Sequence, residues 1–315
     1  MTIAVSGATG WIGTRVVDEL RSRGLKVRRF VRNATQPDDC VWALERPSRT
    51  WAEHLSGCDA VIHCAGRVHI SEEYNGGDIA EFRRINRDGT DHLIMAATAA
   101  GTKRFVLAST IAVYDWAQRR PMAETDATAP MTAYARSKLE AEACLRRSNI
   151  DWRICRLATV FGDGDTANFA RLAAAIRRRH FFLPGDGTAM KSVLPLEIAS
   201  SVLVQAACDE KWARTTVNVA MPVAPSLSEI CAAFSAVCGM PQVRHIPIAA
   251  VRGAAMIGSV LARFGVRLPF TCQTLSKLTT NTVVVTNQLN RLIPVRQWPN
   301  FAATLAHHAS YYSQL

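Results

Sequence analysis

The stretch SGATGWIG, residues 6–13, spaces Gly7, Gly10 and Gly13 three residues apart, directly after the apolar run Thr2–Ser6. A β-branched run, a glycine-rich turn and an amphipathic stretch predict a strand, a tight loop and a helix. Glycines let such a loop turn sharply and let its backbone approach a pyrophosphate, which the helix N-terminus stabilises. The spacing therefore predicts a dinucleotide-binding loop. The alternative interpretation is a turn with a purely structural role.

Short apolar runs then alternate with longer helical patterns through the first 160 residues. Strands are expected at Thr2–Ser6, Lys26–Val31, Asp59–Cys64, Arg104–Thr110 and Asp151–Phe161. Helices are expected at about Trp11–Ser22, Arg49–Ser56, Ile79–Ala100 and Thr132–Ser148. This alternation predicts an α/β fold of the Rossmann type, with a doubly wound parallel sheet and helices on both of its faces.

After Gly162 the pattern becomes mainly helical. Helices are expected at about Asn168–Arg179, Leu196–Cys208, Ser226–Cys238, Ala249–Phe264 and Asn300–Ser313, with one strand at Thr215–Val219. The chain shows neither a repeat nor a low-complexity linker. We therefore expect residues 1–165 to form the dinucleotide-binding domain, with return segments near 189–220. Residues 166–315 are expected to form mainly a smaller, mostly helical substrate-binding lobe.

The charge and cysteine content limit the classes of partner. The formal net charge of +11 favours anionic partners, but the basic residues are dispersed, which favours a solvated surface over a nucleic-acid stripe. The nine cysteines include no C-x-x-C, so we expect no metal site and a reducing, cytoplasmic location. The start of the chain lacks the features of a signal peptide. The most apolar segment, Ile248–Val266, contains Arg252 and Arg263, which argues against a membrane span.

The end of the second expected strand bears on the choice of dinucleotide. NAD sites usually place an acidic residue about 20 residues after the loop, whereas an arginine accommodates the 2′-phosphate of NADP. Here the strand reads KVRRFVRN, and Arg32 stands near the expected position with no carboxylate before Asp38. Arg32 thus favours NADP over NAD, and both cofactors are kept. The alternative is that these arginines are a solvated strand end.

Tyr134 and Lys138 are four residues apart, so their side chains share one helix face. Chance alone would produce such a pair in about one chain of ten with this composition. Its position is more informative, because the helix follows the strand that ends in Ser109 and Thr110, at the edge where open α/β sheets bind ligands. The ammonium group favours a phenolate and so suits an acid–base tyrosine. The alternative is a packing tyrosine beside an exposed lysine.

These features together resemble the extended short-chain dehydrogenase/reductase superfamily, in its NAD-dependent epimerase/dehydratase branch. The likeness runs through most of the chain. Its motifs are DAVIHCAG (59–66), RINRDGTDHLIMAA (84–97), KRFVLASTIAVY (103–114) and RLATVFGDGD (156–165). The resemblance implies a catalytic set of Thr110, Tyr134 and Lys138. It also implies cofactor contacts from Gly7, Gly10, Trp11, Ile12, Gly13, Ala65, Gly66, Tyr134 and Lys138, to which we add Arg32.

Within that family the chain is similar to bacterial nucleotide-sugar 4-epimerases. The likeness places Asn168 at the substrate diphosphate, and Ser109 or Thr110 is expected to bond the substrate oxygen. The expected reaction is oxidation of a sugar hydroxyl, with Tyr134 removing its proton, followed by reduction of the keto intermediate from the other face. A homodimer is one option for the assembly, which the sequence leaves open.

Several positions depart from the family pattern and leave other functions open. The usual Arg-Pro is Arg156-Leu157, the usual Tyr-Gly-Pro-Gly is Phe161–Gly164, and a pair of acidic or amide residues is Glu197-Ile198. Residues 41–47 offer no equivalent of the Asp that often contacts adenine. An NADPH-dependent carbonyl reductase or a hydroxysteroid-dehydrogenase-like enzyme is therefore one alternative. A non-catalytic NADP-sensing protein is another.

Overall fold

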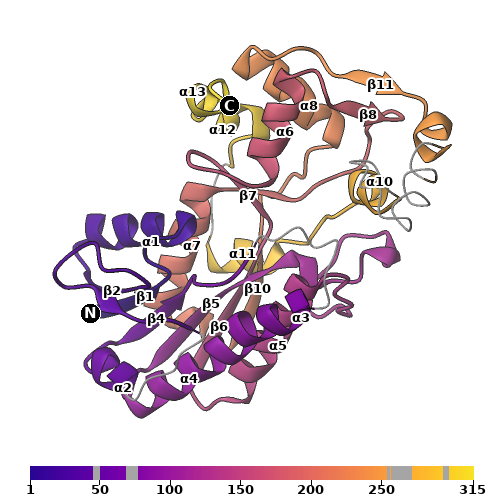
Figure 1. Cartoon of the computed structure of the whole chain (residues 1–315). Helices are drawn as coiled ribbons and strands as arrows, with labels where there is room; N and C mark the ends of the chain where they lie inside the picture. The colour runs from indigo at the N-terminus through magenta and orange to yellow at the C-terminus, as the bar shows by residue number, and fades with distance from the viewer. Residues whose placement is uncertain (45–49, 69–76, 254–255, 257–271, 294–297) are drawn as a thin grey trace.

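The computed structural model describes residues 1–44, 50–68, 77–253, 256, 272–293 and 298–315, and the structural statements below concern those residues. Its centre is a seven-stranded parallel sheet (Figure 1). In chain order the strands are β1 (Thr2–Ser6), β2 (Lys26–Val31), β3 (Cys40–Val41), β4 (Ala60–His63), β5 (Arg104–Thr110), β6 (Asp151–Leu157) and β10 (Thr215–Val219).

The spatial order of these strands is β10-β6-β5-β4-β1-β2-β3. The chain builds outwards from β1 through β2 to β3, then crosses back to β4 on the other side of β1 and continues outwards to β10. The direction of winding therefore reverses between β1 and β4. Ligands of open α/β sheets bind at such a switch point, beyond the carboxyl ends of the strands.

Helices cover both faces of the sheet. On one face lie α1 (Trp11–Ser22) and α7 (Leu196–Cys208), packed against each other (Figure 1). On the other lie α2 (Thr50–Leu55), α4 (Gly89–Ala99) and α5 (Ala133–Arg147), with α3 (Gly77–Phe82) and the π-helical turn η1 (Arg83–Asp88) beside them. Successive side chains of β1 point to opposite faces of the sheet. Ile3 and Val5 therefore pack in the core beneath α1 and α7, and Ala4 packs in the core on the other face.

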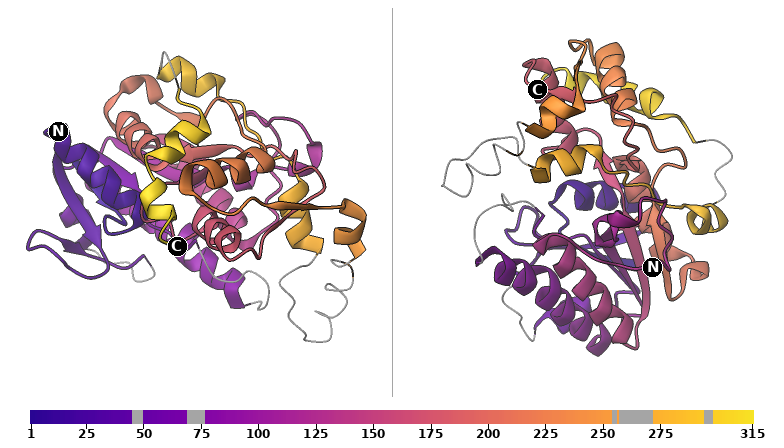
Figure 2. Two further views of the ribbon diagram at one scale, coloured as in Figure 1. Left: turned by 90° about the horizontal axis from the view of Figure 1, so that it is seen from above. Right: turned by 90° about the vertical axis from the view of Figure 1, so that its right-hand side faces the viewer.

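A smaller lobe lies beyond the carboxyl edge of the sheet, at the end where β6 leaves it (Figures 1 and 2). Its own core joins Phe161, Phe169, Phe234, Phe301 and Tyr312. Two short parallel ladders, β7 with β9 and β8 with β11, complete it. Its elements, with the nearby α11, are β7 (Thr159–Phe161), α6 (Asn168–Arg177), β8 (Phe182–Pro184), β9 (Val193–Pro195), α8 (Leu227–Cys238), β11 (Arg244–Ile246), α10 (Cys272–Thr279), α11 (Asn287–Leu292), α12 (Phe301–Ala306) and α13 (Ala309–Tyr312).

The predicted α/β class, with a Rossmann-type doubly wound sheet and a mainly helical C-terminal portion, is confirmed. One expected strand differs in form: 151–161 is interrupted at Ala158, whose N–H bonds the carbonyl of Val219 at 2.9 Å. Beyond Ala158 the backbone leaves the large sheet and pairs with β9 instead. This break directs the chain from the sheet into the smaller lobe.

Three expected helices also differ. The helix expected at 79–100 contains the π-helical turn 83–88, and the one expected at 300–313 is split between α12 and α13. The helix expected at 168–179 ends at Arg177, because Arg179 adopts a left-handed conformation with φ 58°. The helix expected at 249–264 lies mostly outside the described residues, although 248–253 is helical. Within the described part of the chain, no helix is long and apolar enough to cross a membrane.

Candidate active site

The glycine loop after β1 is packed too closely for side chains at two of its positions. Gly7 has φ +70°, and a Cβ there would lie 2.8 Å from the backbone of Ala65. A Cβ on Gly13 would lie 2.0 Å from the carbonyl oxygen of Gly7. The loops that follow β1 and β4 therefore touch at the switch point of the sheet. The glycines predicted to bind the cofactor form a cradle that a larger residue would fill.

The N-terminus of α1 opens from this loop. Gly10 is its N-cap, with no side-chain cap hydrogen bond and no acidic residue in the first turn. The first N–H groups of a helix lack intrahelical partners, so they and the helix dipole favour an anion at this end. Trp11 is half-buried, and its indole Nε1–H donates to the carbonyl of Asp163 at 2.6 Å. The loop is thus tied to the segment that follows β7.

The end of β4 is held to the same loop by a buried histidine. His63 is fully buried, with Nδ1 2.5 Å from the hydroxyl of Ser6 and Nε2 2.9 Å from the hydroxyl of Thr90. Burial, followed by the charge of Lys138, holds the pKa of His63 well below its usual value, so the ring is neutral. A neutral imidazole can donate from one nitrogen and accept at the other, which suits two hydroxyl partners.

The three arginines of the KVRRFVRN segment differ in their surroundings. Arg28 donates to the carbonyls of His54 and Ser56, at 2.5 and 2.8 Å. Arg29 is buried and lies 3.0 Å from a carboxylate oxygen of Asp39. Arg32 is exposed, and no described residue forms a hydrogen bond or ion pair with it. Arg32 is therefore the arginine here that is open to a ligand.

Tyr134 and Lys138 lie on the first turns of α5, which packs against β5. Tyr134 is half-buried, and its ring meets that of Phe82 edge to face at 6.3 Å between centroids. Lys138 is only 5% exposed. Burial lowers the pKa of Lys138 to about 8, while the negative charges of Glu142 and, when ionised, Cys64 act in the opposite direction. Lys138 is thus a buried lysine beside the carboxyl end of β4, not the exposed lysine of the alternative interpretation.

A buried amide connects this helix to the loop after β4. Asn86 accepts from the N–H of Arg67 at 2.7 Å and donates to the carbonyl of Arg67 and the hydroxyl of Ser137, each at 3.0 Å. Ser137 in turn donates to the carbonyl of Tyr134 at 2.8 Å. Asn86 lies within the π-helical turn, and such turns are frequent at functional sites. The amide fixes the first turn of α5 against the segment that follows Gly66.

The two hydroxyl residues at the end of β5 have different roles in the structure. Thr110 is half-buried and accepts from the N–H of Ala112 at 3.2 Å, as the cap of a short 3-10 helix. Ser109 is buried, and its hydroxyl donates to Glu142 at 2.5 Å. Thr110 therefore lies at the sheet edge where the sequence places it, whereas Ser109 has a partner inside the protein. Its predicted substrate contact remains a prediction.

Asn168, the other predicted substrate residue, is exposed at the first position of α6 in the smaller lobe. Asp165 holds this helix start: it is buried and accepts from the N–H groups of Ala167 and Ala170, at 2.6 and 2.9 Å. Asn168 comes from the lobe that faces the carboxyl edge of the sheet (Figure 1).

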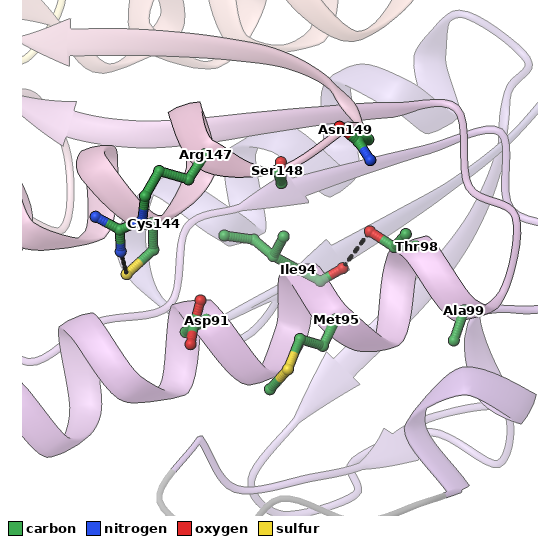
Figure 3. Close-up of a pocket in the computed structure, with 9 residues that line it drawn as sticks. All are labelled: Asp91, Ile94, Met95, Thr98, Ala99, Cys144, Arg147, Ser148 and Asn149. Atoms are coloured by element: carbon green, nitrogen blue, oxygen red, sulfur yellow. Dashed lines mark hydrogen bonds between the residues drawn. The ribbon is translucent and has the colours of Figure 1, made fainter.

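A surface pocket between α4 and α5 does not belong to this site. Figure 3 shows its lining, which includes Asp91, Met95, Cys144 and Arg147. These helices run antiparallel to the strands. The pocket lies near the C-terminal ends of the helices, and therefore towards the edge of the sheet where the strands begin. It contains none of the residues predicted to act. The described residues also contain no group of three His, Cys, Asp or Glu side chains placed to hold a metal ion.

Sequence reasoning missed Glu142, which is fully buried and accepts hydrogen bonds from Ser109, Arg156 and Arg146. The sequence did contain a signal for it: Glu142 follows Lys138 by four residues, as Lys138 follows Tyr134, so all three side chains share one helix face. The apolar residues around it predict ordinary helix packing. Only the tertiary structure shows that the three donors meet there.

Comparison with known proteins gives relatives that align over half or more of the chain. A 30% identical relative, over 56% of this chain and 57% of its own length, is a UDP-glucose 4-epimerase of Vibrio cholerae. The match thus spans little more than half of that epimerase. A 3-diazoavenalumate denitrifying reductase of a Streptomyces species is 28% identical over 79% of this chain and 85% of its own length.

Solved structures match the fold over nearly the full length. MoeE5 in complex with UDP-glucose and NAD has a TM-score of 0.76 at 21% identity, covering 100% of this chain and 99% of its own. Human epimerase family protein SDR39U1 with NADPH also has a TM-score of 0.76, at 19% identity, covering 98% and 99%. At these identities the likeness concerns the fold alone.

The family model described as "NAD dependent epimerase/dehydratase family" matches residues 3–194. That range runs from β1 through the glycine loop, the buried histidine of β4, the end of β5 and the helix of Tyr134 and Lys138, to the start of β9. Because the match covers more than half of the chain and includes these elements, the chain belongs to the NAD dependent epimerase/dehydratase family.

Proposed function

We propose that this protein is an NAD(P)-dependent oxidoreductase or epimerase that acts on a nucleotide-diphosphate sugar through a keto intermediate. The proposal rests on one observation: in the first turns of α5, the buried Lys138 lies one helical turn from Tyr134. Thr110 ends the strand β5 against which this helix packs. A tyrosine, a buried ammonium and a hydroxyl at this edge suit proton transfer at a carbonyl or alcohol oxygen.

The residues of the switch point fit a nicotinamide dinucleotide. Gly7, Gly10 and Gly13, with the amides of Trp11 and Ile12, would hold the pyrophosphate. Ala65 and Gly66 would lie along the cofactor at the end of β4. Lys138 would bond the nicotinamide ribose. A bound nicotinamide dinucleotide would supply the redox chemistry, namely reversible hydride transfer at a substrate carbon.

Arg32 supports NADP within this proposal. Its guanidinium group is exposed at the end of β2, while Arg28 and Arg29 are engaged within the fold. A guanidinium group can bond a 2′-phosphate with two parallel hydrogen bonds. Relatives of this fold are known with NAD and with NADPH, so the family admits either cofactor.

Three side chains would handle the substrate proton. Tyr134 would take the proton from a hydroxyl group during oxidation and return it during reduction. Lys138 would stabilise the phenolate, because a nearby positive charge favours the ionised form of the phenol. The hydroxyl of Thr110 would donate to the same substrate oxygen. Asn168, from the facing lobe, would contact the diphosphate, which the net charge of +11 also favours.

A second candidate is an NADPH-dependent carbonyl reductase with the same three residues. The observation favouring it is the extent of the matches: a ketoreductase of Stigmatella aurantiaca aligns over 84% of this chain, whereas the Vibrio cholerae epimerase aligns over 56%. An alignment over 84% of the chain is longer than the sheet domain and therefore reaches into the smaller lobe, where substrate selection is expected. A reductase exchanges its cofactor at each turnover, which also suits the exposed Arg32.

The test is a turnover assay that follows cofactor and sugar together. The purified protein is incubated with UDP-glucose, UDP-N-acetylglucosamine and their 4-epimers, with NAD, NADH, NADP or NADPH, and the products are identified by mass spectrometry and chromatography. Interconversion of two UDP-sugars without net cofactor turnover supports the epimerase. Steady NADPH consumption with a non-nucleotide carbonyl compound supports the reductase. Dinucleotide binding without turnover of either class would support a sensing protein.

A further inference from the structure

Glu142 occupies a buried position one helical turn beyond Lys138 on α5. Its side chain is fully buried. Its carboxylate accepts from Ser109 at 2.5 Å, from Nε and Nη2 of Arg156 at 3.1 and 2.8 Å, and from Arg146 at 3.0 Å. A fully buried carboxylate is stable only when donors satisfy its oxygens and a positive charge compensates it. Both conditions are met here.

These bonds join α5 to the sheet. Ser109 belongs to β5 and Arg156 to β6, and the two residues are paired in the register of these strands. Arg146 also donates to Thr216 of β10 at 3.0 Å. The carboxylate thus bonds two adjacent strands directly, and Arg146 of the same helix bonds the third. Ser109 directly precedes Thr110, so the same carboxylate also holds the end of β5.

Positive charge exceeds negative charge around Glu142. Arg156 and Arg146 pair with it directly, at 2.8 and 3.0 Å, and the ammonium group of Lys138 lies on the same helix face. The groups that face Lys138 are Glu142, the thiol of Cys64 and the neutral His63, in addition to Tyr134 itself. Burial lowers the pKa of Lys138 to about 8, and the carboxylate of Glu142 opposes this effect.

We propose that Glu142 is a positioning residue of the site: its buried carboxylate keeps the ammonium charge of Lys138 beneath Tyr134 and, through Ser109, holds the end of β5 that bears Thr110. Glu142 contacts neither substrate nor cofactor in this role. The catalytic part of the inference rests on the proposed function. The electrostatic part concerns Lys138 alone, and it can be measured without substrate.

The main test replaces Glu142 by glutamine, which keeps the shape and an acceptor for Ser109 but removes the charge. The chain has six lysines, so 13Cε-lysine labelling gives few NMR signals, and the signal lost in Lys138→Arg identifies Lys138. In the full chain without added cofactor, Glu142→Gln is expected to lower the titration midpoint of Lys138 by about 1 pH unit or more. An unchanged midpoint in a folded variant would overturn the proposal.

A matched control lies on the same helix. Glu140 is partly exposed, with its side chain at 30%, and pairs with Arg83 at 2.8 Å. Glu140→Gln removes the same charge from α5 but is expected to leave the midpoint of Lys138 where it is. An equal decrease in both variants would mean that any negative charge on α5 has this effect, and it would contradict the specific role of Glu142.

The single variant leaves the buried Arg156 without its anion, which alone could unfold the protein. The double variant Glu142→Gln/Arg156→Gln removes both charges of this pair, and a smaller decrease of the Lys138 midpoint is expected, because the loss of the Arg156 cation opposes the loss of the carboxylate. Circular dichroism verifies that each variant is folded. A lowered midpoint together with full turnover in Tyr134→Phe would refute the proposed function yet retain the effect of Glu142 on Lys138. A loss of turnover in Tyr134→Phe with an unchanged midpoint would refute the inference and retain the function.

Discussion

His308 lies between two carboxylates: its Nδ1 is 3.0 Å from Oδ1 of Asp163, and its Nε2 is 3.4 Å from Oε2 of Glu197. The three residues come from the C-terminal segment, the turn after β7 and the first turn of α7. Because the carbonyl of Asp163 also accepts from Trp11, this contact joins the C-terminal helices to the start of the glycine loop helix. The end of the chain thus supports the shape of the candidate cofactor site.

This arrangement predicts a pH-dependent stability. The hydrogen bond to Glu197, and that to Asp163, raise the pKa of His308 above 6.5 despite its burial. A raised folded-state pKa gives stabilisation that is fully present below pH 6.5 and lost as pH rises through the raised value. His308→Gln should therefore lower the melting temperature more at pH 6 than at pH 9. The exposed neighbour His307, changed to Gln, should show no such difference, and a pH-independent effect of His308→Gln would contradict the assignment.

Tyr134→Phe tests the proton-transfer role. Loss of a positioned acid–base group should reduce kcat about 100- to 10,000-fold, while the dissociation constant for the dinucleotide stays nearly unchanged. Single-turnover assays and fluorescence titration of the cofactor measure the two quantities. Tyr311→Phe is the matched control, because that phenol bonds the carbonyl of Asp165 in the smaller lobe. Turnover in Tyr134→Phe equal to that of the control would disprove the mechanism.

Arg32→Ala tests cofactor choice. Removal of one charge-assisted hydrogen bond, of about 1.5–3 kcal/mol, should raise the dissociation constant for NADP about tenfold or more and leave that for NAD unchanged. Calorimetric titration with both dinucleotides measures this ratio. Lys26→Ala is the control, since Lys26 is an exposed cation at the opposite end of β2. An equal loss of NAD and NADP affinity in Arg32→Ala would remove the preference for NADP.

Gly13→Ala tests the cradle. A Cβ at this position would lie 2.0 Å from the carbonyl oxygen of Gly7, so the loop must shift. We expect the unfolding free energy to fall by about 1–3 kcal/mol and dinucleotide binding to be lost. Thermal unfolding with and without cofactor measures both effects. Gly253→Ala is the control, because a Cβ there meets no described residue within 4 Å. Retention of wild-type cofactor affinity in Gly13→Ala would argue against pyrophosphate binding at this loop.

Much of the sheet domain follows from local sequence. The bounds of β1, β2, β5, α1 and α7 agree with the patterns that predict them. The glycine turn after Ser6, for example, marks both the end of β1 and the approach to α1. Continuous apolar runs such as VLA in β5 mark strands buried on both faces, and they predict the parallel sheet correctly.

The small elements of the second lobe could not be predicted in the same way. β8, β9 and β11 have three residues each, and α11 has six, which is too short for a periodic pattern. They exist because neighbouring chain segments pair with them: β8 lies beside β11, and β9 lies beside β7. The break at Ala158 has the same origin, since it depends on a bond to Val219, 61 residues further along the chain.

Local backbone preference and helix periodicity were enough to predict the α/β class, the glycine loop and the shared helix face of Tyr134 and Lys138. The surroundings of each group depend on how the chain packs. This packing buries Lys138, engages Arg28 and Arg29 while leaving Arg32 exposed, and brings Ser109, Arg156 and Arg146 to Glu142. Charge and burial depend on contacts between distant segments, and only the packed chain brings those segments together.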